Sequence, residues 1–430
     1  MNSQDQLWDV AVVGAGIAGM SAAIFAVSKG LSVLHIGNGS GLVFGSGLLD
    51  VLAVHPVKDS TVHKDPWHGI ELLRKDEPSN PLALVGPKAM EVAVNQIMEA
   101  LGKAGMPYEP STTNHFVPTS MGTLKGTFGV PTTMTSGAKA FENKWPTLLI
   151  EIRGLREFSA AQMVHTMGDK WPSLRFEKIE FPDSKGVFEL YATHLATALE
   201  TNKTRQAVID VVRPLIGDAK AVGFPAILGL SESTAVHKAF EDALGVPVFE
   251  IPTMPTSVPG LRLKHSFEVA AAAAGVSRRV QSVVTGVKFD NDIATLTLQD
   301  ATGNQEIQAK AVILATGRFM GRGLFADREK VREPLLDLFV EQPESRENWH
   351  SRDFFAKSGH AINRCGLLVD SKWRPTDAFG AVVWPRLYAV GSILARQDWM
   401  RQKSGSGLAI GTAWAAVSAM SDDFGSVGGV

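Results

Sequence analysis

The chain has 430 residues, enough for two domains or for one large α/β domain with an insertion. Its 42 basic and 44 acidic residues leave a formal charge of −2, which argues against nucleic acid as a partner bound by bulk charge. The single cysteine, Cys365, excludes an internal disulfide and an iron–sulfur cluster or Cys-rich zinc site held by this chain alone. We therefore predict no metal centre and a reducing compartment.

The N-terminal residues MNSQDQLWD contain no basic segment and run directly into an apolar strand, so we expect no signal peptide. No stretch reaches the roughly 20 apolar residues that a membrane-spanning helix needs. We therefore expect a cytoplasmic protein that contacts a membrane only through a partner chain.

The first predicted elements form a strand, a tight turn, a helix and a second strand. Val10–Val13 is an apolar run typical of a buried parallel strand, Ile17–Lys29 has helical character, and Leu31–Ile36 is the next strand. The turn matches G-x-G-x-x-G, in which the glycines allow the tight turn, the approach of a pyrophosphate and close packing of helix on strand. The helix N-terminus adds free N–H groups for an anion. The residues predicted to contact a dinucleotide are Gly14, Ala15, Gly16, Ile17, Ala18 and Gly19.

The second strand ends in His35-Ile36-Gly37-Asn38, without the acidic residue that usually binds the adenosine ribose. We expect His35 and Ile36 to contact the nucleotide part of the cofactor instead. The small-residue segment GSGLVFGSGLLDVL follows, and we expect Gly45, Ser46 and Gly47 to line the cofactor. Asp50 in this segment either begins a helix or is solvated.

Residues 55–275 have a different amino-acid composition, with frequent proline, and long predicted loops. Helical stretches are predicted at about 87–104, 159–169, 187–201 and 231–244. We interpret this portion as an inserted α+β cap domain that binds substrate or a partner. Residues 1–54 and 276–430 then form one discontinuous flavin or dinucleotide-binding domain.

The chain after residue 276 is rich in strands again. Two turn signals divide an alternating segment into a β-meander that ends in the apolar run Ala311–Ala315. A further strand begins at Leu387, and a glycine-rich segment then enters a C-terminal helix, whose N-terminus suits the negative charge of a reduced flavin. The residues predicted to contact the cofactor here are Thr316, Gly317, Gly391, Ser392, Gly405, Ser406, Gly407 and Leu408. The pattern predicts a two-dinucleotide-binding-type flavoprotein fold, a Rossmann-like parallel sheet with a β-meander.

Several segments taken in order resemble one family. They are the Gly14–Gly19 turn, SGLLDVL, FPAILGL (224–230), IPTMPTSVPGLRL (251–263), VILATG, GLLVDSKWRPTD (366–377) and LYAVGSIL with GSGLAIGTAWAA. Together they resemble the B subunit, a flavoprotein, of the anaerobic glycerol-3-phosphate dehydrogenase over nearly the whole chain.

That resemblance implies a three-part complex. The partners would be a catalytic FAD subunit, which oxidises the substrate, together with an iron–sulfur subunit that docks at the membrane, and this chain would carry FMN. FAD is the alternative that the Gly14–Gly19 motif suggests. Electrons would pass from sn-glycerol 3-phosphate, oxidised to dihydroxyacetone phosphate, to quinone in anaerobic respiration, on the cytoplasmic face of the inner membrane.

A substrate with a hydroxyl and a phosphate needs a base and cations. The candidates in predicted loops are His265, with its near-neutral pKa, and Arg262, Arg318 and Arg396, which suit bidentate phosphate contacts. Lys264 and Arg322 are neighbouring options. Whether this chain oxidises the substrate or relays electrons stays open.

Two other functions fit the same motifs. The chain could be a self-sufficient FAD oxidoreductase of the fumarate-reductase-like type, or a non-catalytic scaffold that keeps the flavoprotein fold, as the missing ribose carboxylate suggests. A self-sufficient enzyme reduces a dye when purified alone, and a scaffold shows no flavin absorbance.

Overall fold

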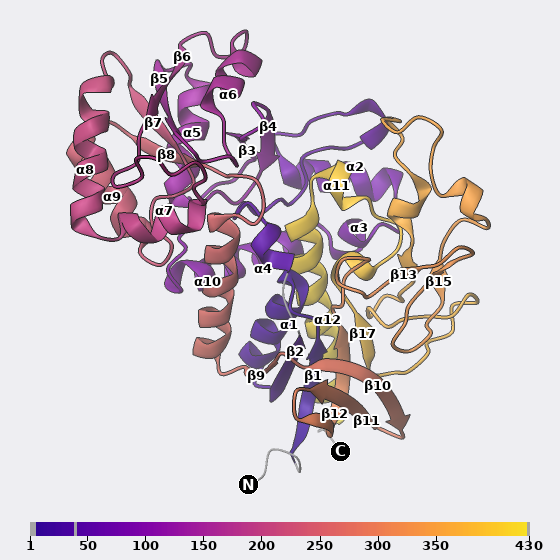
Figure 1. The fold of residues 1–430 in the computed structure, drawn as a ribbon. Coiled ribbons are helices and arrows are strands. Elements are labelled where there is room, and N and C mark those ends of the chain that lie inside the picture. The colour runs from indigo at the N-terminus through magenta and orange to yellow at the C-terminus, as the bar shows by residue number, and fades with distance from the viewer. Residues whose placement is uncertain (1–5, 38–40, 428–430) are drawn as a thin grey trace. The chain divides into compact units, whose positions relative to one another are not determined.

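The computed structural model describes residues 6–37 and 41–427, with the side chains described as far as residue 424. Its chain divides into two compact units (Figure 1). Unit 1 comprises residues up to Gly41, Asp50–Ile97 and the chain from Phe267 onward. Unit 2 comprises Leu42–Leu49 and Met98–Ser266.

Unit 1 is built on a seven-stranded sheet in which β1 (Leu7–Val13) is central. The order is β10-β11-β12-β1-β2-β9, and β17 also pairs with β12. The pairs of β1 with β2 and β12, of β2 with β9 and of β12 with β17 are parallel, whereas β10, β11 and β12 form an antiparallel meander. The other strands are β2 (Val33–Gly37), β9 (Ser277–Val280), β10 (Val283–Asp290), β11 (Ile293–Asp300), β12 (Gly303–Leu314) and β17 (Leu387–Ala389).

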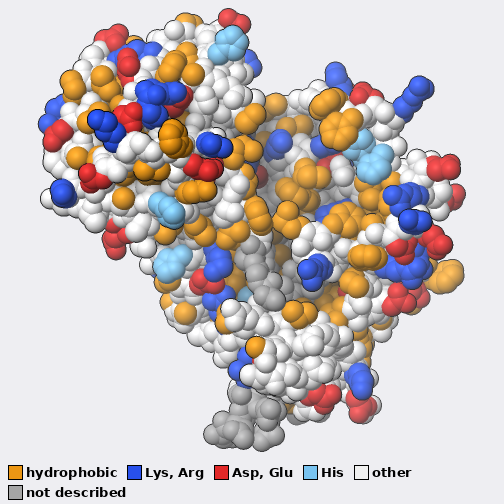
Figure 2. Space-filling view, viewed as in Figure 1, with side chains coloured by type: hydrophobic (Ala, Val, Ile, Leu, Met, Phe, Trp, Pro, Cys, Tyr) orange, Lys and Arg blue, Asp and Glu red, His pale blue; other side chains and the backbone are white. Residues whose placement is uncertain are grey.

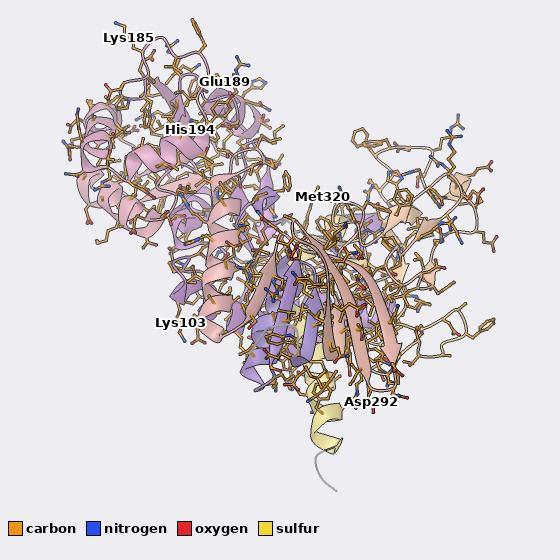
Figure 3. All side chains as sticks on the ribbon, turned by 60° about the horizontal axis from the view of Figure 1, so that its bottom comes forward. Lys103, Lys185, Glu189, His194, Asp292 and Met320 are labelled. Carbon is orange, nitrogen blue, oxygen red and sulfur yellow. The ribbon has the colours of Figure 1, made fainter. Side chains whose placement is uncertain are left out.

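The predicted fold class is confirmed in this unit. Val10, Ala11 and Val12 are fully buried because β1 has strands on both sides and helices over it, as an apolar parallel strand requires. In Figure 3, Asp292 in the β10–β11 turn and Met320, six residues after β12, mark opposite ends of the sheet.

Two helices, α1 (Ile17–Ser28) and α12 (Gly405–Val427), pack along each other. Both begin at the edge where the parallel strands end (Figure 1). Small residues make this close approach possible, since Ala22, Ala23 and Ala413 are fully buried. The sheet edge at which ligands of such folds bind therefore receives two helix N-termini.

Residues 55–97 belong to unit 1, so the predicted boundary of the inserted domain at residue 55 is wrong for this part of the chain. The physical reason is packing on α12: at Gly411, a side chain would meet Met90 and Val85. Asn80 also donates a hydrogen bond of 3.0 Å to the carbonyl oxygen of Arg396. The helices of this segment are α2 (Pro66–Asp76), α3 (Pro81–Val85) and the first part of α4 (Pro87–Lys103).

Unit 2 holds a four-stranded parallel sheet in the order β6-β5-β7-β8. Helices alternate with these strands along the chain, which makes the unit α/β rather than the expected α+β. The strands are β5 (Thr147–Ile152), β6 (Leu174–Ile179), β7 (Ala221–Pro225) and β8 (Val248–Ile251), with the hairpin β3 (His115–Pro118) and β4 (Leu124–Thr127) beside them in sequence. The helices are α5 (Thr132–Glu142), α6 (Ala160–Met167), α7 (Ala192–Leu199), α8 (Asn202–Val212) and α9 (Ser233–Leu244), and α10 (Val258–Ala274) leads out.

The chain of unit 1 between β12 and β17 has little regular structure. It contains the short pairs β13 (Phe325–Ala326) with β14 (Val331–Arg332) and β15 (Val340–Glu341) with β16 (Gly366–Leu367). α11 (Trp399–Gln402) follows β17. The 3-10 helices among the described residues are η1 (Gly41–Phe44), η2 (Val57–Asp59), η3 (Arg213–Leu215), η4 (Arg346–Asn348), η5 (Ala361–Arg364) and η6 (Gly391–Ile393). Among the described residues no helix combines the length and the apolar character that crossing a bilayer requires.

Candidate functional site

The glycines of the turn between β1 and α1 have two different roles. A side chain at Gly14 would collide with the carbonyl oxygen of Ala315, and one at Gly19 would collide with the carbonyl oxygen of Gly14. At Gly16, by contrast, a Cβ would meet no atom of the described residues 6–37 and 41–427 within 4 Å, apart from its chain neighbours and the backbone of its own helix. Gly14 and Gly19 are therefore required by the packing of the protein itself, whereas the space beside Gly16 suits a group that is not part of the chain.

The N-terminus of α1 fits an anionic group. Gly16 is the N-cap residue, and as a glycine it has no side chain with which to cap the helix. The first N–H groups of an α-helix have no partner within the helix and attract negative charge. A helix N-terminus of this kind is suited to an anion, and binding of a pyrophosphate here stays a prediction.

His35 contacts the turn from the neighbouring strand. Its side chain is 2% exposed, and Nε2 lies 2.9 Å from the carbonyl oxygen of Gly14, to which it donates. Burial lowers its pKa from 6.5 to about 4, so the ring is neutral near neutral pH and is a weak base. His35 holds the turn in place from inside the protein.

Ile36 has a buried side chain, and its contact with the cofactor stays a prediction. It is buried in β2, and its carbonyl oxygen accepts the N–H of Gly14 at 2.8 Å. Asn38, where the ribose carboxylate is missing from the sequence, lies outside the described residues.

Two further predicted segments meet at the same edge of the sheet. β12 and β17 are parallel neighbours, and the N–H of Val390 donates to the carbonyl oxygen of Leu314. A Cβ on Gly317 would lie 3.7 Å from the Ser392 hydroxyl. The Thr316 hydroxyl is buried without a hydrogen-bond partner in the described part of the chain, and a bound polar group could satisfy it.

Gly391 lies where this edge meets the two helices. Its φ is +79°, and a Cβ there would approach the Ala18 Cβ to 2.7 Å. Its N–H donates to the Thr412 hydroxyl of α12 at 2.8 Å. Sequence reasoning missed Thr412, although a threonine in an otherwise apolar, small-residue helix was a visible signal. The structure thus brings together Gly14–Gly19, Thr316, Gly317, Gly391 and Ser392.

The start of α12 is used mainly for internal packing. Gly407 donates its N–H to the carbonyl oxygen of Asp50 at 2.6 Å, and a side chain there would press on Val51. Ser406 and Leu408 are buried, and Gly405 faces the ring of Trp399. Asp50 therefore neither begins a helix nor stands alone in solvent: its backbone anchors α12.

Gly45, Ser46 and Gly47 belong to unit 2 and contact residues of that unit. The Ser257 hydroxyl donates to the carbonyl oxygen of Gly45, and the Tyr108 hydroxyl donates to that of Gly47 at 2.8 Å. Ser46 lies 3.5 Å from the Lys125 ammonium. Contact of these residues with the cofactor stays a prediction.

Arg262 is not free to bind a substrate phosphate. Its guanidinium forms a two-point ion pair with Glu250 at 2.6 and 2.9 Å, and it donates to the carbonyl oxygen of Gly229. Both side chains of the pair are buried, at 5% and 0% exposure. The predicted catalytic role of Arg262 is therefore wrong, because its guanidinium is buried and already paired. Arg262 instead joins the segments PTSVPGLRL and FPAILGL.

The expectation that GLRLKH is a loop is also wrong, because these residues lie within α10. His265 is exposed on that helix. A base for a hydroxyl proton needs a position beside the reacting atom, and nothing in unit 2 encloses His265.

Arg318 and Arg396, in unit 1, are also bonded to the protein. Arg318 donates to the carbonyl oxygens of Cys365 and Ile362 at 2.6 and 2.7 Å, and burial lowers its pKa. Arg396 forms a two-point ion pair with Glu341, and this hydrogen bonding raises its pKa. The four catalytic candidates therefore do not form one cluster in either unit.

Within residues 6–37 and 41–427, no three His, Cys, Asp or Glu side chains lie together as a metal site requires. Cys365 is buried, and burial raises its pKa to about 11, so its thiol is protonated and unreactive.

The similarity of this chain to known proteins extends over the residues of this site. The family described as "FAD binding domain" matches residues 9–408. The chain is 31% identical to the B subunit of a probable anaerobic glycerol-3-phosphate dehydrogenase of Halobacterium salinarum, over 96% of this chain and 98% of that protein. It is 28% identical to the B subunit of the anaerobic glycerol-3-phosphate dehydrogenase of Vibrio cholerae, over 95% of each. Among solved structures, the open conformation of a flavocytochrome c3 fumarate reductase is similar with a TM-score of 0.45 and 10% identity, over 97% of this chain and 78% of that one.

Proposed function

Because this chain belongs to the family of anaerobic glycerol-3-phosphate dehydrogenase B subunits and carries an FAD binding domain, we propose that it is the flavin-containing redox subunit of such an enzyme. The observation that carries the proposal is the meeting of Gly14–Gly19, Thr316–Gly317 and Gly391–Ser392 at one edge of the sheet, with Gly16 as the position open to a ligand. A flavin bound there supplies a two-electron acceptor that can pass electrons on singly.

We propose FAD as the cofactor. The match to an FAD binding domain supports FAD, and nothing in the comparisons supports the FMN that the resemblance implied. The backbone N–H groups at the start of α1 would hold the pyrophosphate, and Thr316 and Ser392 would supply hydroxyls. His35 would act indirectly, by fixing the carbonyl of Gly14.

The deciding experiment is to purify the chain, release its cofactor by denaturation and determine the mass of the released compound. Release of FAD would support the proposal. Release of FMN would show that the cofactor is FMN and would leave the flavoprotein function in place, whereas the absence of any flavin would favour the scaffold function.

We propose further that the chain relays electrons and that a partner oxidises the substrate. Arg262, Arg318 and Arg396 are already bonded to carboxylates or carbonyl oxygens, which leaves them unsuited to a substrate phosphate. The complex would oxidise sn-glycerol 3-phosphate to dihydroxyacetone phosphate. The partners would be the catalytic FAD subunit, where this oxidation takes place, together with the iron–sulfur subunit. Quinone would be the acceptor, and the membrane would be reached through a partner on its cytoplasmic side.

This relay function is tested by supplying glycerol 3-phosphate and a redox dye to the purified chain, alone and then with both partners. Dye reduction only in the presence of the partners supports a relay. Reduction by the chain alone would instead favour a self-sufficient FAD oxidoreductase.

A further inference from the structure

The irregular part of unit 1 contains a loop, Ser351–His360, that exposes two neighbouring phenylalanines; we call it the aromatic loop. Phe354 is 76% exposed and Phe355 82% exposed. Their rings pack edge to face, with centroids 5.1 Å apart. Figure 2 shows hydrophobic side chains among basic and acidic ones over the part of unit 1 that is orange in Figure 1. Two large apolar side chains thus lie in water next to each other.

The backbone of the aromatic loop is nevertheless well ordered by its own polar groups. His360 accepts the N–H of Ser351 at Nδ1, so its Nε2 carries the proton and donates to the carbonyl oxygen of Phe354. The Ser351 hydroxyl donates to the carbonyl oxygen of Gly359, and Asp353 accepts the N–H of Phe355. Because the loop is already ordered, it would lose less conformational entropy when it binds a partner.

The base of the loop rests on elements next to the cofactor edge. A Cβ on Gly359 would lie 3.0 Å from the carboxylate of Asp398, the N-cap residue of α11, and α11 exposes Trp399 and Met400 in part. Immediately after the loop, the carbonyl oxygen of Ile362 accepts from Arg318, the residue that follows Gly317. The chain that follows the loop is therefore linked by one hydrogen bond to the turn after β12.

The aromatic loop itself carries a net positive charge. Arg352 and Lys357 lie in the loop, are exposed and form no ion pair with any residue that the structure describes. Asp353, the acidic residue of the loop, accepts the N–H of Phe355 and keeps its negative charge, so two basic residues and one acidic residue leave the loop with a net charge of +1. Such a surface is complementary to an apolar pocket with carboxylates at its rim.

We propose that the aromatic loop is the docking site of a partner protein, which receives Phe354 and Phe355 in an apolar pocket and pairs carboxylates with Arg352 and Lys357. This inference rests on the proposed function, because it takes the partner to be one of the companion subunits of the same enzyme. Aromatic side chains and arginine are the residues enriched at the energetically dominant centre of protein interfaces. Docking at this loop would place the partner beside the turn that borders the cofactor edge.

The test uses the full chain with its flavin and the two companion subunits, each purified and each used as a binding probe. The variant F354A/F355A is compared with the unmodified chain by biolayer interferometry. We expect its affinity for one of the two subunits to fall at least about tenfold, because truncation of a central aromatic anchor has this effect. The charge-reversal variant R352E/K357E should also bind more weakly and should lose part of the salt dependence of binding.

The matched control is Phe379→Ala, which removes an equally large and 96% exposed ring from a separate turn of unit 1 closed by Asp377. It should bind as the unmodified chain does, and all variants should keep their flavin absorbance.

The outcomes separate this inference from the function on which it rests. If the unmodified chain binds neither companion, the proposed complex fails and the docking site fails with it. If the chain binds but F354A/F355A binds equally well, only the docking site is wrong. If light scattering shows instead that the unmodified chain self-associates and that F354A/F355A does not, the occupant is a second copy, which overturns the proposed partner.

Discussion

His35 and Gly14 are joined by a hydrogen bond of 2.9 Å between the imidazole Nε2 and the peptide carbonyl oxygen. The bond links the second strand to the first residue of the glycine-rich turn. Because the N–H of Gly14 donates in turn to the carbonyl oxygen of Ile36, the turn is held on both sides by one strand. A histidine thus fixes the shape of the predicted phosphate site without facing a ligand.

This bond predicts a pH dependence of stability. The pKa of His35 is about 4 in the folded protein and 6.5 when unfolded, so the unfolded chain alone gains a proton between these values. Protonation of His35 in the unfolded chain therefore lowers the free energy of unfolding as the pH falls from 6.5 toward 4, and it has no such effect above pH 6.5. His35→Gln should abolish this pH-dependent loss in the free energy of unfolding, which is about 2 kcal/mol between pH 6.5 and pH 5.

The measurement is urea unfolding of both proteins at pH 7 and pH 5, where the shared carboxylates cancel in the comparison. His265→Gln, a change at an exposed position of α10, is the control and should behave as the unmodified chain. Identical pH dependence of the unmodified chain and His35→Gln would show that the buried ring does not titrate as expected.

The turn itself predicts that two glycine substitutions fail in different ways. Gly16→Val should fold normally, because the added Cβ would meet none of the described residues outside its own helix and chain neighbours within 4 Å, but it should lose flavin because the side chain fills the space of the pyrophosphate. Gly19→Ala should fold poorly, because its methyl group would collide with the carbonyl oxygen of Gly14.

Flavin absorbance per protein and circular dichroism separate these two effects. Undiminished flavin in folded Gly16→Val would refute the placement of the pyrophosphate.

The ion pair of Arg262 and Glu250 predicts a structural phenotype in place of a catalytic one. Arg262→Met would leave the fully buried Glu250 carboxylate without its cation, which costs about 3–5 kcal/mol in comparable buried pairs. The double variant R262M/E250Q removes the stranded charge and should recover part of that stability. Thermal unfolding measures both, and a fully stable Arg262→Met with lost substrate turnover would instead restore the catalytic role.

The hydrogen bond from Gly391 to Thr412 predicts that α12 helps to hold the cofactor edge. Thr412→Val has nearly the same shape but leaves the N–H of Gly391 without an acceptor, and we expect a loss of about 1–3 kcal/mol. Thr412→Ser keeps the hydroxyl and should be much closer to the unmodified chain. Chemical denaturation with flavin retention as the second readout makes the comparison, and equal stability of the Val and Ser variants would contradict it.

The amino-acid sequence by itself was sufficient for the strand–turn–helix unit at Val10–Ile36, the meander and the flavoprotein fold class. These features depend on short-range properties: apolar runs, glycine where the backbone turns tightly, and alternation along strands. The family was recognisable for the same reason, since its motifs are contiguous stretches of the chain.

Only the tertiary structure decided the partners of individual side chains. Arg396 meets Glu341 and Arg262 meets Gly229 across 55 and 33 residues of sequence, so no local pattern distinguished them from substrate-binding arginines. Residues 55–97 likewise join unit 1 because they pack on α12, which lies at the other end of the chain. Local composition determines which backbone shapes are accessible, whereas the availability of a charge for chemistry depends on which distant groups folding brings beside it.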